Sequence, residues 1–156
     1  MRKVISFFSI VLWIVVWMLP VYANDPSNNL DWAIAKGEIE EVKKILSKHP
    51  ELADVPFVER SNWRPLQWAA INRHVDIVEY LLELGVNVDA RNNDGETALL
   101  IVTTDLDADT DIAKVLINYG ANVNTRDSDG LTPLKNAIQI GNEELVKLLR
   151  ENGAKE

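Results

Sequence analysis

The sequence has 156 residues, of which 26% are charged, and a formal net charge of −8 at pH 7. This length suits one domain with a buried core and is too short for two. The chain contains no cysteine, which excludes disulfides, thiol catalysis and cysteine-based zinc sites. The negative charge repels phosphate backbones and anionic bilayers, so we do not expect the chain to bind nucleic acid.

Residues 1–23 differ in character from the remainder. The chain begins with "MRK", continues with the apolar run 4–19, and then reads "PVYA". This order, with Val21 and Ala23 at the positions that a signal peptidase inspects, is typical of a secretory signal peptide cleaved after Ala23. The alternative is an uncleaved membrane anchor, although 4–19 falls just short of a comfortable span. No cysteine follows the run, which excludes a lipoprotein anchor.

Cleavage would remove Arg2 and Lys3 and take the net charge from −8 to −10. An exported domain without disulfides must be held together by packing alone, and this suits a bacterial periplasm better than a eukaryotic secretory route. We therefore expect a periplasmic protein that has no membrane contact once the signal peptide is cleaved. A basic partner is the electrostatic expectation, while solubility alone also accounts for the acidity.

The rest of the chain repeats itself. Leu66, Leu99 and Leu134 are spaced by 33 and 35 residues, and three glycines at positions 85, 120 and 153 are spaced by 35 and 33. Repetition at this period indicates a stacked array of similar units. The units span approximately 28–58, 61–93, 94–128 and 129–156.

Each unit has the same physical plan. An Asp-Gly pair, as at 129–130, predicts a tight turn, because glycine accepts a positive φ. Thr132 follows at a helix start, where its hydroxyl can cap a free N–H, and Pro133 occupies the first helical position. A second helix has apolar residues at period 3.6, as in 75–82. The glycine after it, such as Gly85, ends that helix in a left-handed conformation.

This plan resembles the ankyrin repeat family. The resemblance is carried by "RPLQWAAINRHVDIVEYLLELGVNVDAR" (64–91), "DGETALLIV…DIAKVLINYGANVNTR" (94–126) and "DGLTPLKNAIQIGNEELVKLLRENGA" (129–154), with a weaker copy at 29–55. It implies that residues 24–156 form an all-α ankyrin repeat solenoid of about four helix-turn-helix repeats with projecting hairpin-like loops. Arg64 replaces the capping threonine of the second copy, and Ala98 replaces the proline of the third.

We find no pattern of catalytic residues and expect no enzyme, cofactor or metal. The two histidines, His49 and His74, lack a second ligand at helical spacing; the resemblance implies that His74 ties neighbouring loops together. The alternating acids from Asp105 to Asp111 could begin a calcium loop, but Thr110 and Leu116 occupy the positions where such a loop has glycine and glutamate. An acidic loop between helices is the simpler interpretation.

The tryptophans divide into two groups. Trp32 and Trp68 fall at equivalent places in the first helices of copies one and two, where we expect them to pack in the core. Trp63 falls in a projecting turn. There it either folds onto the linker 49–62 or is presented to a partner, since tryptophan is enriched in binding hot spots.

The resemblance implies protein binding through the turn tips and the exposed positions of the first helices. Among the matched positions, Ile71, Leu131 and Ile140 would form an apolar patch bordered by acids; packing between repeats is the alternative. The expected partner-binding residues are Arg60, Ser61, Trp63, Ile71, Asn72, Asn93, Asp94, Glu96, Thr104, Asp105, Ser128, Asp129, Leu131, Gln139 and Ile140.

Together these features predict a monomeric, periplasmic protein-binding module that sequesters or inhibits another exported protein. One such role is an immunity or self-protection factor against a cell-wall hydrolase, whose basic surface an acidic face would suit. The alternatives are a membrane-anchored scaffold that keeps 4–19, or a secreted effector that binds host proteins through the same surface.

Overall fold

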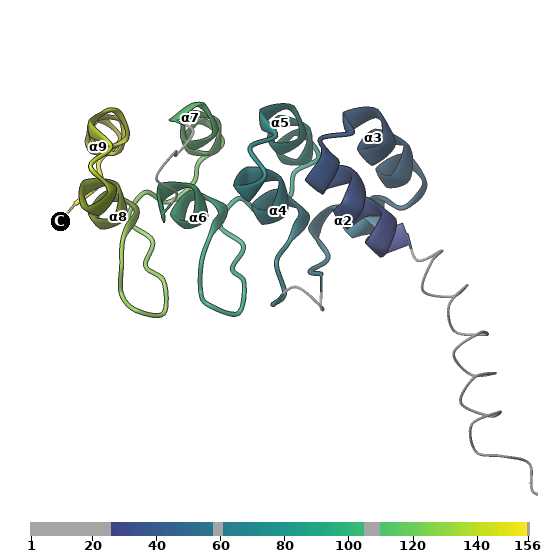
Figure 1. The fold of residues 1–156 in the computed structure, drawn as a ribbon, viewed down its shortest axis with the longest axis horizontal. Helices are drawn as coiled ribbons and strands as arrows, with labels where there is room; N and C mark the ends of the chain where they lie inside the picture. Colours follow the sequence, from purple (N-terminus) through teal and green to yellow (C-terminus); the bar gives the residue numbers. More distant parts are fainter. Residues whose placement is uncertain (1–25, 58–60, 105–109, 156) are drawn as a thin grey trace, which may run out of the picture.

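The computed structural model describes residues 26–57, 61–104 and 110–155, and this part of the chain folds into pairs of antiparallel helices stacked in a row (Figure 1). A short 3-10 helix, η1 (Pro50–Asp54), follows the first pair. The α-helices are α2 (Pro26–Lys36), α3 (Ile39–Lys48), α4 (Pro65–Ile71), α5 (Val75–Glu83), α6 (Ala98–Thr104), α7 (Thr110–Asn118), α8 (Pro133–Ile140) and α9 (Glu143–Glu151). The all-α prediction is confirmed for the described residues.

The helices form two layers. The first helices of the repeats, α2, α4, α6 and α8, lie side by side in one layer, and α3, α5, α7 and α9 form the other (Figure 1). Each helix contacts its partner in the same repeat and its counterpart in the next repeat. The long loops that precede α6 and α8 project on the side of the first helices, away from the layer formed by α3, α5, α7 and α9 (Figure 1). This is the arrangement of a solenoid, in which every repeat is held by its neighbours.

The core lies between the two layers and between successive repeats. The leucines that set the sequence period, Leu66, Leu99 and Leu134, are buried with Leu30, their counterpart in the first repeat. From the second helices Ile77 and its equivalents are added to the same cluster. Burying each side chain of this size contributes roughly 1.5–3 kcal/mol, so the repeated leucine and isoleucine positions hold the stack together.

Two first helices begin with the expected threonine cap, and α4 begins with a different one. The hydroxyl of Thr132 accepts a hydrogen bond from the amide of Lys135 at 3.3 Å, and Thr97 caps α6 in the same way. Arg64 cannot do this. In its repeat the side chain of Gln67 reaches back and accepts from the Arg64 amide at 2.8 Å, so the cap is supplied from inside the helix.

The prediction that Trp32 packs in the core is wrong: its side chain is 53% exposed. Its counterpart Trp68 is half-buried because α2 lies against it, and the indole Nε1 of Trp68 donates to the carbonyl oxygen of Asp31 at 3.0 Å. Trp32 lies on the same side of the first repeat, which is the end of the described stack. The same residue type is therefore covered in one repeat and open in the other.

Residues 1–23, which carry the predicted signal peptide, lie outside the described residues, and so do Asp105, Asp107 and Asp109 of the calcium alternative. No helix among the residues that the structure describes has the length and apolar character needed to cross a bilayer.

Candidate protein-binding surface

The turn tips of successive repeats are joined to one another. The amide of Asn93 donates to the carbonyl of Ser61 at 3.2 Å, and the side-chain amide of Asn62 donates to the Asn93 side-chain oxygen at 2.8 Å. One repeat further on, the hydroxyl of Ser128 donates to the carbonyl of Asp94 at 2.7 Å. These bonds fix the spacing of the tips. The exposed carboxylates of the row, at Asp94 and its counterpart Asp129, are consequently held at defined positions.

The tips of the third and fourth repeats are each shaped by an Asx side chain that the sequence interpretation missed. The side-chain oxygen of Asn92 accepts from the amides of Asp94 at 2.9 Å and Glu96 at 3.0 Å. Asp127 does the same for Asp129 and Leu131. The recurrence of Asn or Asp two residues before each Asp-Gly would have indicated this, because such side chains form turns with the backbone that follows them.

Arg91, which is exposed, joins two tips at the surface of the stack. Its guanidinium donates to the hydroxyl of Thr125 at 2.7 Å and to the carbonyl of Arg126 at 2.6 Å, and it also donates to the carbonyl of Gly95. Arg126, the counterpart of Arg91 in the next repeat, donates to the carbonyl of Gly130 at 3.0 Å. The link therefore runs from the third repeat's loop to the fourth's.

Four of the predicted residues line one hollow. Thr104 of α6, Leu131 of the last turn, and Gln139 and Ile140 of α8 surround a space of about 360 Å³ together with Asn136. Leu131 and Ile140 are half-buried, whereas Thr104 and Gln139 are exposed. The hollow thus has apolar walls and a polar rim, and it lies between the first helices of the third and fourth repeats.

The residues predicted in the second repeat are placed differently. Ile71 is half-buried at the end of α4, but it is not among the residues that line the hollow with Leu131 and Ile140. The side chain of Asn72 donates to the carbonyl of Trp68 at 2.7 Å and so closes the end of α4. Glu96 is similarly occupied, because it accepts from the Asn92 side chain at 2.8 Å.

Trp63 is folded down onto its own repeat. Its backbone pairs with Phe57, whose amide donates to the Trp63 carbonyl at 2.8 Å. Its ring meets Trp68 edge to face, with centroids 5.9 Å apart. This geometry favours the first of the two interpretations of Trp63, as a residue packed onto the linker. Two further predicted contact residues, Arg60 and Asp105, lie outside the described residues.

Two titratable side chains of the described residues contact a neighbouring repeat. The Nε2 of His74 lies 3.4 Å from the carbonyl oxygen of Ala35, in the last turn of α2, so this side chain contacts the preceding repeat at a helix end, whereas the sequence predicted a tie between loops. Hydrogen bonds to Asp111 and then to Glu144 raise the pKa of Lys114 above its ordinary value and tie α7 to α9. Nowhere in 26–57, 61–104 or 110–155 do three His, Asp or Glu side chains gather into a group that could hold a metal.

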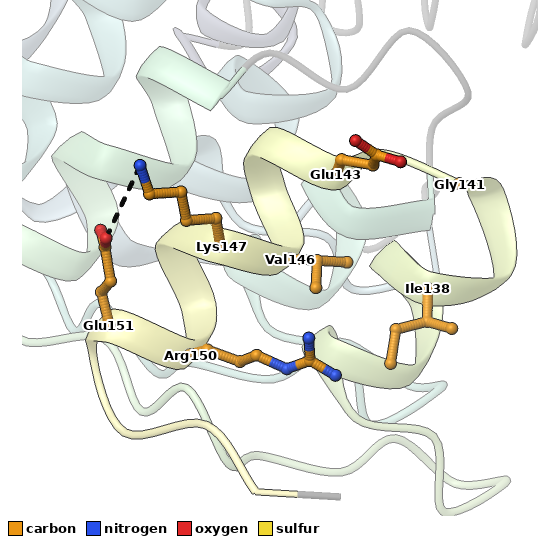
Figure 2. A pocket seen from close by; sticks show the side chains of 7 residues that line it. All are labelled: Ile138, Gly141, Glu143, Val146, Lys147, Arg150 and Glu151. Atoms are coloured by element: carbon orange, nitrogen blue, oxygen red, sulfur yellow. Dashed lines mark ion pairs between the residues drawn. The ribbon is translucent and has the colours of Figure 1, made fainter.

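A second hollow, of about 790 Å³, lies on α8 and α9 at the end of the stack. Figure 2 shows Ile138 of α8 and Val146 of α9 beside the guanidinium of Arg150. Glu143, Lys147 and Glu151 border the hollow, and Lys147 forms an ion pair with Glu151 at 3.9 Å. The sequence did not indicate this surface, because the counterparts of Ile138 in the other repeats are buried against the repeat that follows.

Comparison with known proteins gives one family and several partial relatives. The sequence model of a family described as ankyrin repeats, with three copies, matches residues 11–92 and 84–156. A probable E3 ubiquitin-protein ligase of rice, XBOS32, is 38% identical over 44% of this chain and 14% of its own length. Protein phosphatase 1 regulatory subunit 27 of human is 38% identical over 41% of this chain and 40% of its own length. Palmitoyltransferase akr1 of fission yeast is 35% identical over 42% of this chain and 10% of its own length. The matched region is therefore less than half of each relative.

Proposed function

Since the chain belongs to the ankyrin repeat family, we propose that it is a protein-binding module whose partner docks on the turn tips and on the hollow beside them. The hollow formed by Thr104, Leu131, Gln139 and Ile140 carries this proposal. It offers apolar surface in a polar rim, which is the composition of a small protein-recognition site. The joined tips next to it form a rigid acidic border, so little ordering is required on binding.

The relatives support a binding role more than a catalytic one. The human relative is named as a regulatory subunit of a phosphatase. The ligase and the transferase are much longer proteins, of which the match covers only 14% and 10%. Their activities reside in whole proteins and are not carried over to this chain. We infer that the partner is a separate protein and that the repeats supply the contact surface.

The finer role follows from charge and from the first 23 residues. We propose that the chain is exported to the periplasm and there sequesters or inhibits another exported protein. A basic cell-wall hydrolase would suit the carboxylates of Asp94 and Asp129 at the tips, because unlike charges favour encounter. A membrane-anchored scaffold or a secreted effector would use the same surface. A mass that places the start of the purified chain at Asn24 excludes the anchor, and recovery outside the cell favours the effector.

The binding proposal is tested by capture of partners from a periplasmic extract at low salt. An Ile140→Glu variant places a charge in the hollow and should lower recovery by at least about tenfold, since apolar anchors dominate such interfaces. The matched control is Leu84→Glu. Leu84 is 48% exposed at the end of α5 in the second repeat, and it does not line the hollow. Equal recovery on Ile140→Glu and the unaltered chain would refute the proposed surface.

A further inference from the structure

Both ends of the described stack leave a repeat-facing side chain uncovered. At one end Ile138 of α8 is 47% exposed, whereas its counterparts Ile34, Ala70 and Thr103, each four residues after the period leucine, are buried. At the other end Trp32 of α2 is 53% exposed, although its counterpart Trp68 is covered by the preceding repeat. The two ends lie at opposite extremes of the row (Figure 1).

The repeat interfaces inside the molecule show that these two positions meet. The side-chain amide of Asn136 donates to the hydroxyl of Thr103 at 3.4 Å. Thr103 is at the Ile138 position of the third repeat, and Asn136 is at the Trp32 position of the fourth. Between the first two repeats the same positions hold Ile34, which is buried in the core, and Trp68, which is half-buried and packs against that core. The two ends of the described stack therefore present an isoleucine and a tryptophan at the positions that adjoin each other across an inner interface.

The charges of the two ends are also matched. Within the stack, Lys114 of α7 pairs with Glu144 of α9 at 3.4 Å. Lys147 occupies the Lys114 position in the last repeat, six residues before its closing glycine. Glu40 occupies the Glu144 position in the first, three residues after Gly37. The side chains of Lys147 and Glu40 are 76% and 85% exposed, and they carry opposite charges.

Each end also has a charge at a position where the second repeat is buried and apolar. Glu41 stands at the position of Ile77, and Arg150 stands at the position of Leu82. These charges weaken association at an end relative to an inner repeat interface, because burying a charge costs free energy. Because Glu41 and Arg150 differ in sign, they also favour contact between unlike ends over contact between like ends.

We propose that the chain self-associates head to tail, with the α8 and α9 hollow of one copy receiving the α2 and α3 end of a second copy. Ile138 then packs on Trp32, and Lys147 pairs with Glu40. A contact of this kind joins two different surfaces and leaves a free end on each copy, so it produces open linear assemblies. The association is weak and depends on concentration, because a single half-polar repeat face is buried. It replaces the monomer expected from the sequence at high concentration.

The absence of native cysteine makes site-specific cross-linking a direct test. A full-length Glu40→Cys variant and a Lys147→Cys variant are mixed with a short bis-maleimide. Cross-linked heterodimer should form about tenfold more than homodimer of either variant alone. Adding Ile138→Glu to the Lys147→Cys chain should reduce the yield to the homodimer level, because the charge would be buried against Trp32. Leu84→Glu in the same chain should leave it unchanged. All altered side chains are exposed, and circular dichroism checks that the fold is retained.

A charge exchange provides the second readout, by sedimentation velocity of the cysteine-free chain. Lys147→Glu should lower the concentration-dependent increase in sedimentation coefficient, and Glu40→Lys in the same chain should restore it, because the pair is then reversed across the contact. Heterodimer no more abundant than homodimer would overturn the proposal, as would a yield that Ile138→Glu does not change. If residues 4–19 of the same chain, or another protein, cover Trp32 instead, the yield of cross-linked heterodimer should also fall to the homodimer level.

Discussion

The imidazole of His74 lies directly over Gly37 of the preceding repeat. A Cβ placed on Gly37 would come within 2.6 Å of Cε1 and 2.8 Å of Nδ1 of that ring. Gly37 also has φ of +72°, which a side chain would resist. The loop of the first repeat thus requires glycine both for its backbone and for the histidine that joins it to the second repeat.

Gly37→Ala should therefore destabilise the fold more than the same change at Gly141. Gly141 is the counterpart in the last repeat, with φ of +76° and no neighbour within 4 Å of the added Cβ. The left-handed conformation alone costs about 1–2 kcal/mol, and this is the expected loss for Gly141→Ala by urea unfolding. The contact with His74 should raise the loss for Gly37→Ala to about 3 kcal/mol. If the two variants lose the same free energy, or if His74→Ala gives no relief in the Gly37→Ala chain, the contact is not a constraint.

Gln67 is a buried polar residue whose side-chain oxygen and nitrogen are both hydrogen-bonded. Besides accepting from Arg64, its side-chain amide donates to the carbonyls of Ala90 at 3.0 Å and Glu96 at 2.8 Å. Gln67→Leu should fit sterically, because Leu100 is buried at the same position of the third repeat. It should nevertheless cost about 2 kcal/mol, since the Arg64 amide and the Ala90 carbonyl lose a partner.

The control for this prediction is Lys135→Leu, at the same position of the fourth repeat, where the side chain is exposed. Its effect on the free energy of unfolding should stay within about 0.5 kcal/mol. A loss at Gln67 no larger than that at Lys135 would mean that the buried amide contributes nothing to joining the second repeat to the following loop.

Arg91 should hold the last two turn tips together more firmly than Arg126 holds its own. Arg91→Ala removes bonds to the following repeat, at Thr125 and the Arg126 carbonyl, so we expect a loss of about 1–2 kcal/mol and faster hydrogen exchange at the Ser128 amide. Arg126→Ala removes a bond within a single tip and should cost less. Exchange at Ser128 that is unchanged in Arg91→Ala would contradict the link between tips.

The repeat explains which parts of the fold could be predicted. Leu66, Leu99 and Leu134 occur at a regular interval, and the same local physics of turn, cap and apolar helix acts at each copy, so the helix pairs and the core followed from the residues. Features peculiar to one copy did not. Gln67 stands where the third and fourth copies have Leu100 and Lys135, so its bonds are not repeated there. The bonds from Arg91 to Thr125 and to the Arg126 carbonyl reach the following loop and depend on what that loop presents. Ser61 and Asn62 have φ of 53° and 57° where other copies have Asp-Gly, and nothing in the period indicates that.

Part of the candidate binding surface could be predicted for the same reason. The positions of Leu131, Gln139 and Ile140 follow from the register of α8, and they do line a hollow. The register does not show which side chains already make hydrogen bonds inside the molecule. Asn72 bonds to the Trp68 carbonyl and Glu96 bonds to the Asn92 side chain, and neither could be foreseen. Nor does it show which repeat lies at an end, and the error at Trp32 has that origin.

Trp32 and Trp68 offer a direct comparison of one residue type at one repeat position. Trp68 packs against the core, meets Trp63 edge to face and donates to Asp31, so Trp68→Ala should lose about 3–5 kcal/mol in urea unfolding. Trp32→Ala removes a side chain that is 53% exposed, and at low protein concentration its loss should stay below about 1 kcal/mol. Tryptophan fluorescence gives an independent check, because acrylamide should quench Trp32 far more readily than Trp68. Losses of similar size would show that Trp32 is covered in solution, and their dependence on protein concentration would then distinguish cover by a second copy from cover by the chain itself.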